Sequence, residues 1–145
     1  MRPDELAARE QVRQAIAAYA HAVDRGRFED AAACFTADGV LDVRDGDRSE
    51  GRDAISARFA VAGEKLAAAS EKAIVRHHVS SIAIEADVTS GTATASSYFF
   101  VVTEIGPDHW GTYRDTLRRD DTSGRWLFTE RRVTVEGRTG PSRMT

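Results

Sequence analysis

The sequence has 145 residues, of which 41% are hydrophobic and 30% charged, a composition that suits a single domain over residues 1–145. The net charge is −3 and charges of both signs alternate along the chain, so nucleic-acid binding has no electrostatic support. Because the chain shows neither an apolar targeting segment nor a run of transmembrane length, we expect a cytoplasmic protein that does not bind membranes. Cys34 is the only cysteine, which excludes an internal disulfide.

Three helices are predicted in the first half of the chain. The first runs over about 3–25 and, after a break at Gly26, a shorter one runs over about 28–35. The third is entered at 51–53 and ends by Ala69. Apolar residues at helical spacing mark one face of the first helix: Val12, Ile16, Tyr19 and Val23. A similar face marks the third helix, which is therefore expected to pack against another element: Ile55, Phe59, Ala62 and Leu66.

Strands dominate the second half of the chain. A first strand is expected at about 39–45, and after a polar turn at 45–47 it resumes briefly near Glu50. Four β-rich stretches then follow, at 73–86, 92–104, 109–120 and 125–136. Turn residues separate them at 90–91, 106–108 and 121–124. Helices followed by an antiparallel meander predict an α+β fold with the helices on one face of the sheet.

Five segments, which together extend over nearly the whole chain, carry a family pattern: 19–43, 50–55, 76–85, 111–119 and 125–133. Their order and spacing resemble the SnoaL-like branch of the nuclear transport factor 2 (NTF2)-like superfamily. The resemblance implies a cone-shaped α+β barrel, in which three N-terminal helices pack on a strongly curved, mixed but mostly antiparallel sheet. That fold hosts dehydratases, isomerases, epoxide hydrolases, polyketide cyclases, dioxygenase β-subunits and binding proteins, so it does not by itself determine the function.

Two candidate catalytic residues follow from the resemblance to scytalone dehydratase. Asp24, in VDRGRF, matches a helix aspartate of that enzyme, and His77, in RHHVSS, matches a strand histidine. The resemblance implies that the imidazole removes a proton beside a carbonyl while the carboxylate orients it. The chain departs from the enzyme at Val23, where the enzyme has a tyrosine, and in GTYRDT, which lacks the enzyme's second histidine. Tyr113 and Asp115 stand there in place of serine and asparagine.

A weaker resemblance links the chain to ketosteroid isomerase. Tyr19 matches the helix tyrosine of that enzyme, but its catalytic aspartate aligns on Val43, one residue past Asp42. One residue along a strand is a change of face, so without a bulge Asp42 points the wrong way. This favours the dehydratase comparison.

The orientation of the strand histidines is open at the sequence level. Adjacent residues in a strand face opposite sides, so at most one of His77 and His78 enters a cavity. The alternation of apolar residues is not decisive, since Val75 and Val79 share a face with His77 whereas Ile82 and Ile84 share one with His78. The resemblance favours His77. A bulge between residues 78 and 82 would remove this conflict.

Each candidate also has a structural interpretation. Asp24 could cap the second helix, and Tyr19 could belong to the core with its hydroxyl satisfied. Tyr113 and Asp115 share a strand face, and an inward aspartate is costly without a partner, so this pair is functional if the face is internal.

Several polar segments receive no functional role. Residues 130–132 are interpreted as a charged strand edge, although the superfamily sometimes places a basic group near the cavity mouth. His109 is expected in a turn, and the residues from Gly137 on lack an apolar pattern and are expected to form a loose tail.

The sequence therefore predicts a cofactor-independent lyase or isomerase of dehydratase type. Its substrate is expected to be a small hydrophobic, cyclic hydroxy or carbonyl compound that reacts at Asp24 and His77 and binds to Tyr19, Tyr113 and Asp115. The alternatives are a non-catalytic ligand-binding protein of the same fold and an accessory subunit. The histidine spacing favours no metal site. We expect a homodimer.

Overall fold

The computed structural model describes residues 1–43 and 47–144. Three helices are present in this part of the chain: α1 (Pro3–Asp24), α2 (Phe28–Ala32) and α3 (Arg52–Ala69). The strands are β1 (Phe35–Val43), β2 (Asp47–Glu50), β3 (Val75–Asp87), β4 (Thr92–Thr103), β5 (Gly106–Arg119) and β6 (Trp126–Arg138).

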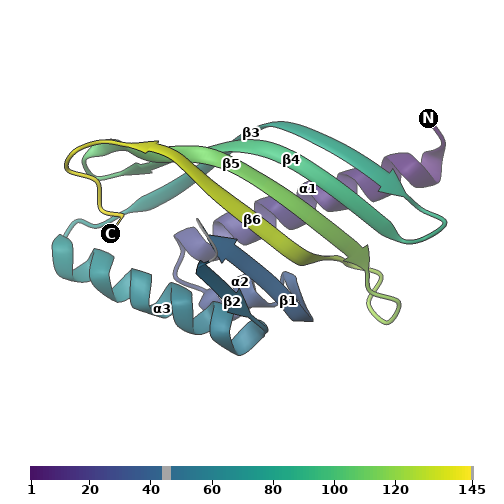
Figure 1. The fold of residues 1–145 in the computed structure, drawn as a ribbon, viewed down its shortest axis with the longest axis horizontal. Coiled ribbons are helices and arrows are strands. Elements are labelled where there is room, and N and C mark those ends of the chain that lie inside the picture. Colours follow the sequence, from purple (N-terminus) through teal and green to yellow (C-terminus); the bar gives the residue numbers. More distant parts are fainter. Residues whose placement is uncertain (44–46, 145) are drawn as a thin grey trace.

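All six strands belong to one curved sheet with the order β2-β1-β6-β5-β4-β3 (Figure 1). Successive hairpins join β3 to β6 in antiparallel pairs, whereas β1 runs parallel to β6. The long helix α1 lies along the sheet and packs on β3 and β6, and α3 lies beside β1 and β2. The short helix α2 contacts both longer helices. The α+β architecture expected from the sequence, with helices on a mixed, mostly antiparallel sheet, is confirmed.

The second helix is shorter than predicted. It ends at Ala32, and β1 begins at Phe35, which was expected to close that helix. Phe35 pairs with Phe128 of β6 and is fully buried. Its apolar side chain suits a helix face and a sheet core equally well, so only the long-range pairing decides its structure.

The other element boundaries lie close to the predicted ones, with two exceptions. The predicted turn at 106–108 is the beginning of β5, and the fourth long strand continues to Arg138. Of the polar turn expected at 45–47, residues 45 and 46 lie outside the described residues and Asp47 begins β2.

The predicted apolar face of α3 is only partly used in the core. Ile55 is fully buried, whereas Phe59 is partly exposed and Ala62 is exposed. Gly63 allows a close approach of α3 to α2, because a Cβ atom there would lie 2.8 Å from the ring of Phe28. No helix in the described ranges is long and apolar enough to cross a membrane.

Candidate active site

Asp24 and His77 are in direct contact. Asp24 is the last residue of α1, and Gly26, with φ +71°, turns the chain away immediately after it. The Asp24 carboxylate accepts the backbone N–H of His77 at 2.9 Å and contacts the His77 Nδ1 atom at 2.5 Å. Their side chains are only 10% and 14% exposed. Both carboxylate oxygens of Asp24 are therefore used to hold one residue of β3.

This contact has a chemical consequence for the imidazole of His77. A carboxylate accepts hydrogen bonds and does not donate them, so Nδ1 carries a proton, and in the neutral imidazole Nε2 keeps its lone pair. The alternative role of Asp24 as a helix cap is not observed, because Arg27 occupies the N-cap of α2 and no side chain in the described ranges caps that helix. The arrangement suits a general base whose ring is fixed by a carboxylate.

His77 and Asp24 line a cavity of about 840 Å3 at the end of the sheet nearest the C-terminal part of α3. Its wall is mainly apolar and is supplied by α1, α2, α3, the segment before β3 and the C-terminal segment: Val23, Phe28, Phe59, Leu66, Ile74 and Met144. Such a volume and lining suit a small, mostly apolar ligand.

The structure distinguishes the two adjacent histidines of β3. His77 faces the cavity, whereas His78 lies on the outer face of the sheet and stacks on Phe100 with a centroid distance of 4.8 Å. The register of β3 against β4 shifts between Ser80 and Ala83, and Ser81 has φ +52°. This bulge brings His77 and the buried Ile84 to the same side of β3, although strict alternation would place them on opposite faces.

The three predicted substrate-binding residues gather around a fourth residue, Arg131. Asp115 and Arg131 form a two-pronged ion pair, with distances of 2.8 Å from Nε and 2.9 Å from Nη2, and both side chains are fully buried. The guanidinium lies over the rings of Tyr113 at 3.8 Å and Tyr19 at 4.4 Å. The interpretation of residues 130–132 as a charged strand edge is therefore wrong for Arg131, which shares the inward face of the sheet with Val133.

Tyr19, Tyr113 and Asp115 do not line the cavity described above. Burial raises the pKa of Tyr19 to about 12 and also raises that of Tyr113, so both phenols stay protonated at neutral pH. Asp115, the inward aspartate that needed a partner, is neutralised by Arg131. Substrate contact by these three residues stays a prediction, and their packing around Arg131 does not support it.

A second aspartate–histidine pair, Asp108 and His109, lies in the same cavity. Asp108 Oδ1 is 2.7 Å from His109 Nδ1, and the Asp108 side chain is fully buried. The register of β4 against β5 passes from Val101–His109 to Val102–Pro107, so Asp108 is the extra residue of a bulge. The bulge lets two successive residues lie on the inner side of the sheet, where a regular strand would place them on opposite faces.

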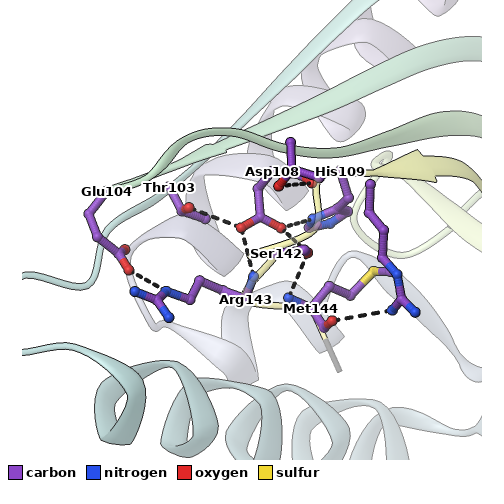
Figure 2. A network of polar contacts seen from close by, with 9 residues as sticks. Thr103, Glu104, Asp108, His109, Ser142, Arg143 and Met144 are labelled. Carbon is purple, nitrogen blue, oxygen red and sulfur yellow. Dashed lines mark hydrogen bonds and ion pairs between the residues drawn. The ribbon is translucent and has the colours of Figure 1, made fainter.

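The C-terminal segment binds Asp108 (Figure 2). Its carboxylate accepts hydrogen bonds from Ser142 Oγ at 2.5 Å and from the backbone N–H of Arg143 at 2.8 Å. Thr103 of β4 donates another at 3.0 Å. Burial alone would raise the pKa of Asp108, but these donors outweigh it and lower the pKa to about 2. The segment expected to be a loose tail is therefore held, through Met144, against the cavity.

Asp108→Asn is expected to reduce stability near neutral pH and to change it little in strong acid. The native pKa of Asp108 lies below that of an unfolded chain, so its contribution is present above about pH 4 and is lost as the pH falls toward 2. Urea denaturation of both proteins between pH 2 and 7 would measure this. Asp121→Asn, in the exposed turn after β5, serves as the control. A difference between wild type and Asp108→Asn that stays constant over this range would contradict the assignment.

The comparisons with known proteins agree with the fold. The model of the SnoaL-like domain family matches residues 4–132. The chain belongs to the SnoaL-like family. The family membership suggested by the sequence is thereby confirmed. Among proteins of curated function, none matches the sequence.

Three solved structures show the range of proteins that this SnoaL-like chain resembles. A Novosphingobium aromaticivorans protein, provisionally assigned as a scytalone dehydratase, is 23% identical with a TM-score of 0.81, covering 96% of this chain and 91% of that one. ActVI-ORFA of Streptomyces coelicolor is 25% identical with a TM-score of 0.76, covering 90% and 96%. A Catenulispora acidiphila protein in complex with S-DNPA is 30% identical with a TM-score of 0.76, covering 90% and 95%.

Sequence reasoning missed Asp108 and His109 in this SnoaL-like chain. The Gly106-Pro107-Asp108 tripeptide is typical of a turn, and it hides a strand bulge. The signal that could have found the pair is a histidine directly after an aspartate in a β-rich stretch. Among the described residues, no group of three or more histidine, cysteine, aspartate or glutamate side chains is arranged to hold a metal ion.

Proposed function

We propose that this SnoaL-like protein is a cofactor-independent lyase or isomerase of dehydratase type. Its substrate is a small hydrophobic, cyclic compound that carries a carbonyl and a hydroxyl group. The observation that carries the proposal is the contact of Asp24 with His77 Nδ1 at 2.5 Å, at the wall of a mainly apolar cavity of about 840 Å3. A hydrogen-bonded carboxylate–imidazole pair in an apolar pocket is a common arrangement for proton transfer.

In the proposed reaction, His77 Nε2 takes a proton from a carbon atom next to the carbonyl group. The electron pair of the broken C–H bond moves toward the carbonyl oxygen to give an enolate. The ionised Asp24 stabilises the imidazolium that forms, since it already accepts the proton on Nδ1. Where a hydroxyl group lies on the next carbon, the enolate re-forms the carbonyl, a new C=C bond replaces the C–O bond, and the departing hydroxide takes the proton from Nε2 as water, which completes a dehydration. Where a C=C bond lies next to the deprotonated carbon, the dienolate instead takes this proton at its far carbon, which completes an isomerisation.

Proton exchange tests this proposal without knowledge of the natural substrate. The probe is 1-tetralone in D2O, and NMR follows the loss of the protons next to its carbonyl. We expect wild-type protein to accelerate the exchange and His77→Ala to reduce the acceleration by at least ~100-fold. His78→Ala, on the outer face, is the matched control. Equal exchange by wild type and His77→Ala would contradict the proposal, and binding of 1-tetralone without exchange would favour a non-catalytic binding protein.

We also propose that the protein is a homodimer that associates through the outer face of the sheet. A row of rings crosses this face, because His78 pairs with Phe100 and Phe100 pairs with Trp110 on successive strands. Phe100 and Trp110 are 43% and 40% exposed, and Tyr98 beside them is 59% exposed. An apolar patch of this kind on a sheet suits an interface between two copies of a chain.

Phe100→Asp is expected to convert the dimer to a monomer, because a desolvated charge at the centre of such a patch is costly. Light scattering coupled to gel filtration measures the mass. Val61→Asp, at an exposed apolar residue of α3, is expected to leave the dimer intact. A monomeric wild-type protein would refute the proposal.

A further inference from the structure

The two cavity histidines lie in one row across the sheet. His77 of β3 pairs with Val101 of β4, and Val101 pairs with His109 of β5. Residues directly opposite one another on neighbouring strands share a face, so both imidazoles stand on the inner side. Two strand spacings place their backbones about 10 Å apart. Both side chains line the same cavity, and Val101 between them is fully buried.

The two histidines present the same kind of nitrogen to the cavity. His109 Nδ1 faces the Asp108 carboxylate at 2.7 Å, as His77 Nδ1 faces Asp24. Because each carboxylate accepts a hydrogen bond from Nδ1, the neutral form of each ring keeps its lone pair on Nε2. Burial also lowers the pKa of His109 despite its neighbour Asp108, so its ring is neutral at pH 7. His109 is therefore a hydrogen-bond acceptor for a bound molecule.

Asp108 is fixed in position, and this fixes the ring of His109. The carboxylate that faces His109 also accepts hydrogen bonds from Thr103, Ser142 and the backbone of Arg143 (Figure 2). Arg143 is itself held by its Nε atom, which lies 2.6 Å from Glu104 Oε1. Strand β4 and the C-terminal segment thus hold Asp108 from two sides, and Asp108 acts as a positioning residue for His109.

We propose that His109 Nε2 accepts a hydrogen bond from a hydroxyl group of the ligand, two strands away from His77 on the same wall of the cavity. The ligand class is a cyclic ketone with a phenolic or alcoholic hydroxyl on the side of the ring away from the carbonyl. The placement of the carbonyl end at His77 rests on the proposed function, whereas the hydroxyl site at His109 stands on its own geometry. An ether oxygen in place of the hydroxyl has no proton to donate, so it leaves His109 Nε2 without a partner.

A pair of probes that differ at this group tests the proposal: 6-hydroxy-1-tetralone and 6-methoxy-1-tetralone. NMR titration of the full chain gives both dissociation constants. We expect wild-type protein to bind the phenol about tenfold more tightly, the usual net effect of one hydrogen bond. His109→Phe keeps a ring but no acceptor, and it should remove this preference, whereas His78→Phe should keep it. A wild-type protein that does not prefer the phenol, or a His109→Phe variant with the wild-type preference, would overturn the proposal.

The tautomer of His109 gives a second measurement that does not depend on a ligand. Nitrogen-15 NMR of histidine-labelled wild-type protein at pH 7 should show His109 with its proton on Nδ1, and Ser142→Ala should keep this tautomer. Asp108→Asn, whose amide can donate to Nδ1, should shift His109 toward the Nε2–H form. A proton on Nε2 in wild-type protein would refute the acceptor role. His77→Ala should reduce the acceleration of proton exchange by at least ~100-fold yet keep the preference for the phenol, so the proposed function and this inference fail separately.

Discussion

Asp24→Asn is expected to lower turnover by roughly 100-fold or more, with a smaller effect on ligand binding. Both oxygens of Asp24 accept hydrogen bonds, one from the His77 backbone N–H and the other from His77 Nδ1. An asparagine has only one oxygen. If that oxygen still accepts the hydrogen bond from the His77 backbone N–H, the amide NH2 group faces Nδ1 and donates a hydrogen bond to it. The imidazole proton then moves to Nε2. The nitrogen that faces the cavity then has no lone pair with which to act as a base.

Steady-state kinetics on wild type and Asp24→Asn, as a function of pH, measure this effect. The loss should appear in kcat, since the proposed reaction uses the pair to move the reacting proton, while KM changes little. Asp30→Asn is the matched control, because Asp30 is an exposed aspartate of α2 whose carboxylate lies 3.9 Å from Arg27. An Asp24→Asn variant within threefold of wild type in kcat would show that His77 does not depend on Asp24.

Asp115→Ala is expected to lower the free energy of unfolding by about 3–5 kcal/mol, because it leaves Arg131 charged and unpaired in the core. Arg131 is fully buried, and its Nη1 atom already lacks a hydrogen-bond partner among the described residues. The aromatic rings around the guanidinium favour a cation but cannot replace the carboxylate of Asp115, which accepts two hydrogen bonds from Arg131.

Urea denaturation with a double variant separates the charge effect from the loss of packing. Asp115→Ala combined with Arg131→Met removes both charges, so it should be more stable than Asp115→Ala alone. Arg132→Ala removes an exposed arginine that contacts Glu130 at 3.1 Å, and it should cost about 1 kcal/mol or less. Equal destabilisation by Asp115→Ala and Arg132→Ala would contradict the role of the buried pair.

The fold could be predicted from local signals, whereas the site could be predicted only in part. Helical spacing in 3–25 and the turns at 90–91 and 121–124 fix most element boundaries, because these signals depend on neighbouring residues. The predicted end of α2 was wrong because Phe35 belongs to β1. Its pairing with Phe128 of β6 decides this, and no local sequence pattern shows that pairing. A family resemblance suggested Asp24 and His77 as candidates. The two residues come into contact because α1 packs on β3.

The remaining site residues depend on register, which the sequence does not show. Arg131 stands in a run of charged residues that is typical of an exposed strand, and only the pairing with Asp115 of β5 turns it inward. Asp108 faces the cavity because one extra residue in β5 reverses the alternation. A single insertion of this kind changes which side chains reach a ligand, and the composition of the segment does not reveal it.

The parallel pairing of β1 with β6 has a consequence for the order in which the protein folds during synthesis. Phe35 cannot take its place in the sheet until Phe128 has left the ribosome, since the two are neighbours only in the finished sheet. Synthesis proceeds at about 5–20 residues per second, so the apolar surfaces of α1, α2 and β1 that β6 later covers stay exposed for several seconds. We therefore expect the nascent chain to bind chaperones during synthesis, and we expect substitutions that weaken β6 to reduce the yield of folded protein in cells.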